Sequence, residues 1–168
     1  MLAIYLGVPV AACQICLPFP TKSLADRILS STHLVLAREN PDQPFTLLTT
    51  RTLVAGDPDP PVLELFLDSS TRRRLSLDRD LAILCSWSPE SGEWRRLGVY
   101  DADLALIVDD VLERRRDWES DPKLRVQYFA NYLGHEKTVL SDLAHLEVAR
   151  APYRQVIQFA GQLSPGEL

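Results

Sequence analysis

The sequence predicts an α+β protein: a small five-stranded β-barrel with flanking helices, followed by a short antiparallel helical segment. Two observations carry this prediction. Five short runs rich in leucine, β-branched and aromatic residues are separated by clusters of Pro, Gly, Asn and Asp, which is the pattern of strands and turns. After Asp101 this pattern stops, and apolar residues recur at helical spacing instead. Strands at such intervals favour a small closed barrel or a sandwich.

The first element that we expect is a helix over residues 23–31. Ser23 and Asp26 have the spacing of a capping box, and Ile28 and Leu29 continue an apolar face. A polar connection over residues 68–80 has room for one helical turn. The expected strands cover residues 33–38, 45–54, 62–67, 81–87 and 94–99.

Four amphipathic helices are expected in the second part of the chain. The first covers Leu104 to Leu112, and the second starts at Asp121-Pro122 and ends at Gly134. The third covers residues 140–148, and the fourth follows Pro152. Short helices with tight links build solenoids of three or more repeats, so these helices either cap the barrel or belong to an array that has been cut off.

The first twelve residues, MLAIYLGVPVAA, are apolar and end in small residues. Their length fits the central region of a secretory signal, although no Lys or Arg precedes them. Val10 to Cys13 resembles a bacterial lipobox, in which cleavage before Cys13 leaves that thiol to carry lipid and so to anchor the protein to a membrane. We therefore expect an extracytoplasmic protein: periplasmic, secreted or lipid-anchored. The alternative is a buried first strand of a cytoplasmic domain.

Composition and charge argue against several classes of protein. The chain has 168 residues, a net charge of -5, and basic residues that are scattered or flanked by acids, so we expect no nucleic-acid binding. With 46% hydrophobic residues there is enough apolar material for a core. Three cysteines are too few for a disulfide scaffold, but Cys16 and Cys85 form a candidate disulfide if Cys13 is lipidated.

The opening of the chain resembles netrin-like modules, which include the tissue inhibitors of metalloproteinases. The resemblance rests on Cys13 and Cys16, the run Leu-Pro-Phe-Pro, a short helix, and the strand 33–38. It implies a five-stranded barrel of the oligonucleotide/oligosaccharide-binding type over residues 13–118. Residues 121–168 resemble HEAT repeats. This chain departs from the inhibitors in having Cys-x-x-Cys and few cysteines, so the resemblance implies fold and export rather than activity.

The sequence contains no recognisable set of catalytic residues. The Cys-x-x-Cys is followed by two prolines instead of a helix, which removes the usual means of lowering a thiol pKa. The histidines, His33, His135 and His145, lack zinc-ligand spacing. There is no nucleophile elbow and no phosphate loop. We therefore expect a non-enzymatic protein without metal or cofactor.

The expected function is protein–protein interaction or scaffolding at the cell envelope, with an unidentified partner. The candidate binding residues are Trp87 and Trp94, which flank a hairpin loop, and Tyr128 and Tyr132 in the helical part. Cross-strand packing is the competing explanation for the two tryptophans. An exported inhibitor-like or small-ligand-binding barrel is the second hypothesis, with the free amine of Cys13 as a zinc chelator in its sharpest form. A cytoplasmic domain is the third.

Overall fold

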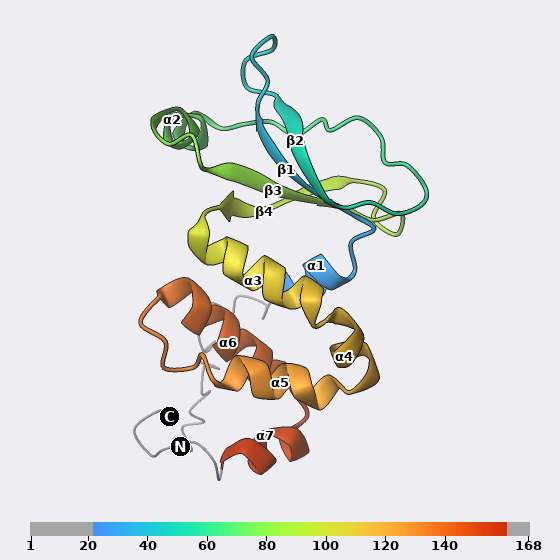
Figure 1. Cartoon of the computed structure of the whole chain (residues 1–168), viewed down its shortest axis with the longest axis vertical. Coiled ribbons are helices and arrows are strands. Elements are labelled where there is room, and N and C mark those ends of the chain that lie inside the picture. Colours follow the sequence, from blue (N-terminus) through green and yellow to red (C-terminus); the bar gives the residue numbers. More distant parts are fainter. Residues whose placement is uncertain (1–21, 161–168) are drawn as a thin grey trace, which may run out of the picture.

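The computed structural model describes residues 22–160, which form seven helices and four strands. The strands gather at one end of the molecule and the later helices at the other, with α3 between them (Figure 1). Within these residues, no helix is both long enough and apolar enough to span a membrane. The elements are α1 (Leu24–Leu29), β1 (His33–Glu39), β2 (Leu47–Val54), α2 (Ser69–Leu77), β3 (Ala82–Trp87), β4 (Trp94–Tyr100), α3 (Ala102–Glu113), α4 (Arg115–Ser120), α5 (Pro122–Ala130), α6 (Thr138–Arg150) and α7 (Tyr153–Ala160).

The four strands form one antiparallel sheet in the order β2-β1-β3-β4. β2 and β4 are its two edges, and within residues 22–160 no strand connects them, so the sheet remains open. The expectation of a closed five-stranded barrel is therefore wrong, whereas the mixed α+β class is confirmed. Register shifts interrupt the pairing of both edge strands, and such irregularities protect an edge from pairing with other chains.

The expected strand at residues 62–67 is the one that is missing. This segment makes a single isolated bridge, between Thr46 and Phe66, and a hydrogen bond from the Leu67 amide to the Phe45 carbonyl at 2.8 Å. The prolines that precede it carry no N–H, so this part of the chain cannot continue a hydrogen-bonded ladder. Its alternating leucines pack on the sheet without making a strand.

Helix α1 begins where the capping box predicts. The Asp26 amide donates to the Ser23 hydroxyl at 3.1 Å, and the Ser23 amide donates to the Asp26 carboxylate at 2.9 Å. These reciprocal bonds satisfy two amides that a helix start leaves without partners. The helix buries Ala25 and Ile28 against the sheet and α3, so the cap fixes the helix that closes one side of the core.

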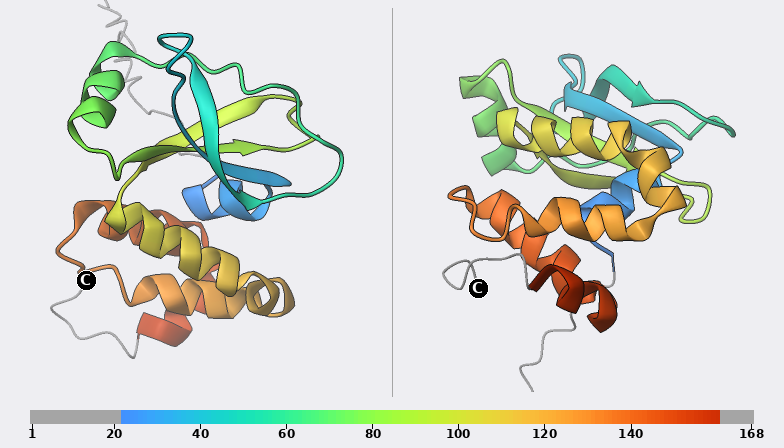
Figure 2. Two further views of the ribbon diagram at one scale, coloured as in Figure 1. Left: turned by 45° about the horizontal axis from the view of Figure 1, so that its top comes forward. Right: turned by 60° about the horizontal axis from the view of Figure 1, so that its bottom comes forward.

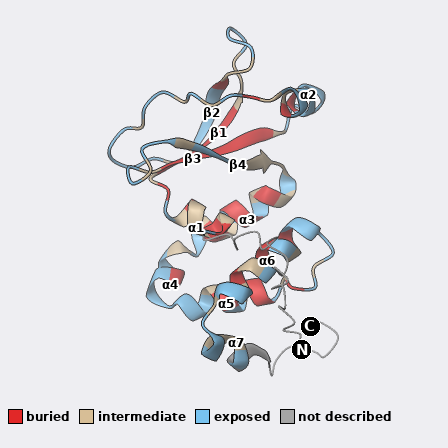
Figure 3. Cartoon of the chain, turned by 180° about the vertical axis from the view of Figure 1, so that it is seen from behind, coloured by how far each residue is buried: buried red, intermediate tan, exposed pale blue. Residues whose placement is uncertain are grey.

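The sheet buries side chains on both faces, because successive residues of a strand point to opposite sides. One face carries a small cluster with α2 and the extended segment before it. The other face is covered by α1 and α3. Buried residues follow the strands and the inner sides of the helices, while outer helix surfaces are exposed (Figure 3). The smaller cluster contains Val35, Ala37, Leu47, Leu67, Leu75, Ile83 and Cys85.

The larger core cluster is continuous from the sheet to the helical end of the molecule. Helix α3 separates the sheet from the layer of α5 and α6 (Figure 2). Its buried face contributes Leu104, Ile107, Val108 and Val111. The predicted boundary at residues 118–121 falls inside this cluster, next to the buried Trp118. Beyond the boundary, the cluster includes Phe129, Ala130, Leu133, Leu140, Leu143 and Ala144.

A partly buried ion-pair network connects α1 to α5 and α6. Arg125 lies 2.7 Å from the carboxylates of both Asp26 and Glu147, and Arg150 also pairs with Asp26. Burial raises the pKa of Asp26, but the Ser23 amide and the two arginines outweigh it and lower that pKa to about 2. Glu147 is only 7% exposed, so its charge depends on Arg125 for compensation.

Candidate functional site

Two adjoining pockets on the helical end of the molecule share the side chains of Tyr128 and Tyr132, and we call them together the tyrosine groove. One pocket, of about 450 Å³, extends toward Trp118 and Leu124. The other, of about 280 Å³, extends toward Leu106. The two tyrosine rings are 5.2 Å apart and form the wall between the pockets. The sequence-based expectation of a binding surface at Tyr128 and Tyr132 thus coincides with a concave surface.

Helix α5 places these tyrosines at the surface through its own sequence pattern. Asp121 caps the helix, and Pro122 occupies its first turn, where a missing N–H costs nothing. Val126 and Phe129 then point into the core, while Leu124 and Tyr128, four residues apart, lie on a more exposed face. The buried ring of Phe129 therefore anchors the helix, and the neighbouring Tyr128 stays partly exposed.

Tyr128 is held in place by groups from α3. Its hydroxyl donates to the Asp110 carboxylate, and the Arg114 guanidinium lies 5.1 Å from the centre of its ring. Burial and the hydrogen bond to Asp110 raise the pKa of Tyr128 well above its usual value. At neutral pH this hydroxyl is protonated and acts as a hydrogen-bond donor. The geometry supports recognition, since a phenol with a raised pKa is a poor nucleophile.

The rim of the tyrosine groove carries exposed apolar side chains and charges of both signs, of which the cations Arg114 and Lys137 are already paired with Asp110 and Asp103. Leu106 and Leu124 are exposed beside the tyrosines. Asp117 lines one pocket and Glu136 lines the other, and neither has an ion-pair partner among residues 22–160. Exposed carboxylates next to exposed leucines favour a ligand that brings apolar and basic groups together.

The structure does not bring the two predicted tryptophans to this groove. Trp87 and Trp94 are register partners in the sheet, so they do form the expected cross-strand pair. Trp87 is only 6% exposed and packs edge-on against His33, and its role in a binding surface stays a prediction. Trp94 is half-buried and donates its Nε1 to the Pro61 carbonyl at 2.8 Å. Packing against sheet neighbours holds both rings, although the buried Nε1 of Trp87 has no hydrogen-bond partner among the described residues.

The predicted cysteine sites are placed only in part. Cys13 and Cys16 lie outside the described residues, so lipidation and the pairing of Cys16 with Cys85 stay predictions. Cys85 is fully buried in the smaller core cluster, on the sheet face opposite α1. Burial raises the pKa of its thiol to about 12, so Cys85 is not a reactive thiolate in the folded protein.

Metal ligands are dispersed in the part of the chain that the structure describes. No three His, Cys, Asp or Glu side chains of residues 22–160 come together in a group that could hold a metal ion. His33 is buried in the sheet, and His135 lies beside Tyr132 in the tyrosine groove.

Comparison with known proteins gave no relatives. No protein-family model matches the chain, and the searches of curated proteins and of solved structures found no match. The resemblances to netrin-like modules and to HEAT repeats therefore stay predictions.

Several groove residues were not singled out from the sequence. Asp110 and Arg114 were visible only as members of charged runs, and His135 was considered only as a metal ligand. Their spacing of four residues places Asp110 and Arg114 on one helix face, which is the only sequence signal for their association. Their approach to Tyr128 depends on how α3 packs against α5.

Proposed function

We propose that this protein is a non-catalytic interaction module that recognises another protein through the tyrosine groove. One observation carries the proposal: Tyr128 and Tyr132 form the shared wall of two adjoining pockets beside exposed leucines. Tyrosine, tryptophan and arginine side chains in hollowed surfaces contribute most to binding energy in protein interfaces. The fixed position of Tyr128 limits the entropy that binding costs.

The partner that fits this groove presents apolar side chains flanked by Lys or Arg. The two pockets accept apolar groups against Leu106 and Leu124. The carboxylates of Asp117 and Glu136 stand at the rim without ion-pair partners among residues 22–160. A net charge of -5 favours the approach of a basic partner over a longer range.

A photo-crosslinking amino acid at position 106 tests this proposal. We expect it to capture a partner whose crosslinked peptide contains apolar and basic residues, as determined by mass spectrometry. The same amino acid at Leu77, which is exposed on α2 at the other end of the molecule, should capture none of it. Tyr132→Ala should lower the affinity for that partner at least about tenfold, the size of an interface hot spot.

Charge reversal supplies a matched control for this experiment. Glu136→Lys should weaken binding, whereas Glu64→Lys, an exposed reversal on the segment that crosses the sheet, should leave it unchanged. Equal capture at positions 106 and 77, or unchanged affinity of a folded Tyr132→Ala protein, contradicts the proposal.

We also propose that the module acts outside the cytoplasm, a proposal that rests on the apolar residues 1–12 and on Cys13. In a bacterial host with the native start, we expect a species that lacks residues 1–12. Intact mass measured on membrane, periplasmic and cytoplasmic fractions checks this, and added lipid mass identifies the anchored form. An uncleaved cytoplasmic species contradicts export.

A further inference from the structure

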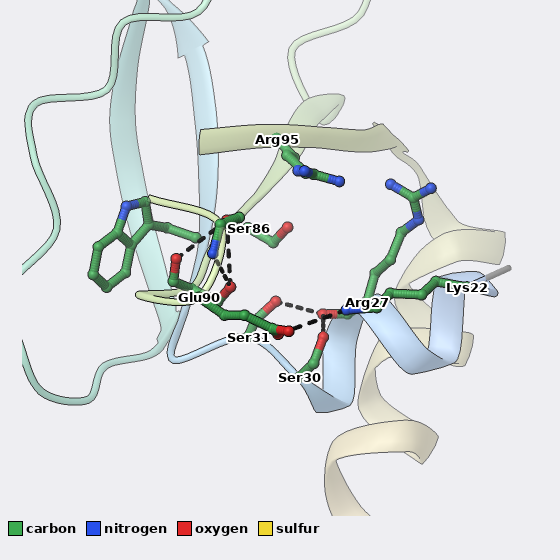
Figure 4. A pocket seen from close by; sticks show the side chains of 10 residues that line it. Lys22, Arg27, Ser30, Ser31, Ser86, Glu90 and Arg95 are labelled. Carbon is green, nitrogen blue, oxygen red and sulfur yellow. Dashed lines mark hydrogen bonds and ion pairs between the residues drawn. The ribbon is translucent and has the colours of Figure 1, made fainter. Parts of the chain in front are cut away.

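A second concave region lies between α1 and the hairpin that joins β3 to β4 (Figure 4). It has a volume of about 320 Å³ and shares no lining residue with the tyrosine groove. We call it the serine–arginine pocket. The lining side chains that matter for its chemistry are Lys22, Arg27, Ser31, Ser86, Glu90 and Arg95.

The sheet and α1 each supply one arginine to the serine–arginine pocket. Ser86 on β3 and Arg95 on β4 are register partners, so their side chains share one face of the sheet. That face is the one α1 covers, and Arg27 reaches the pocket from this helix. Trp87 also lines the pocket, but the other lining residues are all serines or charged residues, so the pocket is mainly polar.

The two arginines of this pocket have no counterion in the part of the chain that the structure describes. Neither Arg27 nor Arg95 makes an ion pair within residues 22–160. Their guanidinium groups extend toward each other across the pocket (Figure 4). Lys22 pairs with Glu90 at 3.7 Å, so the nearest carboxylate already has a cation. Two converging guanidinium groups repel each other unless an anion lies between them.

The serine hydroxyl groups of this pocket differ in whether they already make hydrogen bonds within the protein. Ser31 donates its hydroxyl to the Arg27 carbonyl at 2.5 Å, and Ser30 donates to the same oxygen at 3.4 Å. Ser86 is only 6% exposed, and its hydroxyl has no hydrogen-bond partner among residues 22–160. Because Ser86 lines the pocket, its hydroxyl is available to donate to a ligand oxygen there.

We propose that the serine–arginine pocket binds the dianionic phosphate group of a small phosphate monoester. The two guanidinium forks of Arg27 and Arg95 match the oxygens of a phosphate, and the Ser86 hydroxyl donates to a further oxygen. Two cations without counterions need two negative charges, which a phosphate monoester supplies and a single carboxylate does not. The pocket lies at the small end of the range for ligand sites, which fits a compact ligand.

If the pocket needs two negative charges, its affinity for phosphate should depend on pH. A phosphate monoester gains its second negative charge near pH 6 and inorganic phosphate does so closer to neutral pH, whereas sulfate carries two charges throughout the physiological range. Phosphate binding should therefore strengthen several-fold between about pH 5.5 and 7.5, and sulfate binding should not change. The charged groups around the ligand are Lys22, Arg27, Glu90 and Arg95, with Asp26 and Arg150 on the adjoining side of α1. None of these is a histidine, whose ordinary pKa falls in this range.

Two-dimensional NMR titration of the full chain with inorganic phosphate and with sodium sulfate tests the proposal. We expect saturable shifts of the Arg27 and Arg95 side-chain N–H signals and of the Ser86 amide. Arg95→Ala and Arg27→Ala should each weaken phosphate binding at least about tenfold, because each removes a charge-assisted pair of hydrogen bonds. Arg73→Ala, an exposed arginine on α2, is the matched control and should bind phosphate like the wild type.

Arg95 is exposed, so Arg95→Ala should leave the core intact, and a loss of phosphate binding in this variant would not reflect unfolding. Absence of saturation in the millimolar range overturns the proposal. So does an equal loss in Arg73→Ala, which indicates general attraction of anions to the surface. Phosphate binding that does not change between pH 5.5 and 7.5 refutes the need for a dianion, since the second ionisation of inorganic phosphate falls within this range.

Discussion

Arg125→Ala is expected to lower the free energy of unfolding by about 3 kcal/mol, the loss that follows when one member of a buried ion pair is removed. Arg125 is the shared partner of Asp26 on α1 and Glu147 on α6. Without it, the carboxylate of Glu147 stays buried with no compensating charge. Urea denaturation followed by circular dichroism measures the change.

The control for this variant is Arg116→Ala, an exposed arginine on α4 whose loss should cost less than about 0.5 kcal/mol. A double variant, Arg125→Met with Glu147→Met, should recover much of the loss, because apolar residues of similar volume can replace a buried pair. If Arg125→Ala and Arg116→Ala unfold at the same urea concentration, the network does not stabilise the fold.

The ion-pair network should also affect how stability depends on pH in acid. The pKa of Asp26 is about 2 in the folded protein, below the ordinary carboxyl value of 3.8, so folding favours the charged form. The stability that this group contributes is present above its ordinary pKa and is lost as the pH falls toward 2. Arg125→Ala should therefore flatten this part of the pH profile relative to wild type.

Local signals in the sequence predicted the elements that depend on local chemistry. The capping box at Ser23 and Asp26 correctly predicted the start of α1, and Asp121-Pro122 correctly predicted the start of α5. The strands that became β1, β3 and β4 were predicted to within two residues. Helix α4 was missed because its six residues include only one buried side chain, that of Trp118, which is too little for a helical pattern.

The segment 62–67 was predicted as a strand because apolar residues alternate along it. Leu63, Leu65 and Leu67 alternate as a half-buried strand does, and all three do pack on the smaller core cluster. Alternation reports which side chains are buried, but a strand also needs a neighbour with free N–H and C=O groups. Here the segment crosses one sheet face, and within the described residues its ladder is limited to the isolated bridge between Thr46 and Phe66. The barrel therefore had no fifth strand with which to close.

The two concave regions could be foreseen to different degrees. Tyr128 and Tyr132 stand four residues apart, so one helix face implied their proximity. The serine–arginine pocket joins Arg27 to Ser86 and Arg95 from a distant hairpin, and only the packing of α1 on the sheet brings them together. The Arg125 network, which connects α1, α5 and α6, was hidden for the same reason.

Ending the chain at Ser120 is expected to abolish cooperative folding, although the sequence suggested a separate domain before that residue. Six of the seventeen buried members of the larger core cluster lie beyond residue 120. Their loss exposes the inner face of α3 and the ring of Trp118 to water. The same truncation removes Arg125 and leaves Asp26 without that partner. Each large side chain lost from a core costs about 2–5 kcal/mol, and a domain has only about 5–15 kcal/mol to lose.

Amide signal dispersion in NMR spectra and the urea transition of the truncated chain measure this effect. In the full chain, fluorescence and circular dichroism should report one shared transition, because Trp87 and Trp94 lie in the sheet and Trp118 belongs to the larger cluster that the sheet and the helices share. A truncated chain with dispersed signals and its own cooperative transition would establish two independent domains. The helical part would then be a dispensable addition, and the tyrosine groove could be removed without unfolding the sheet.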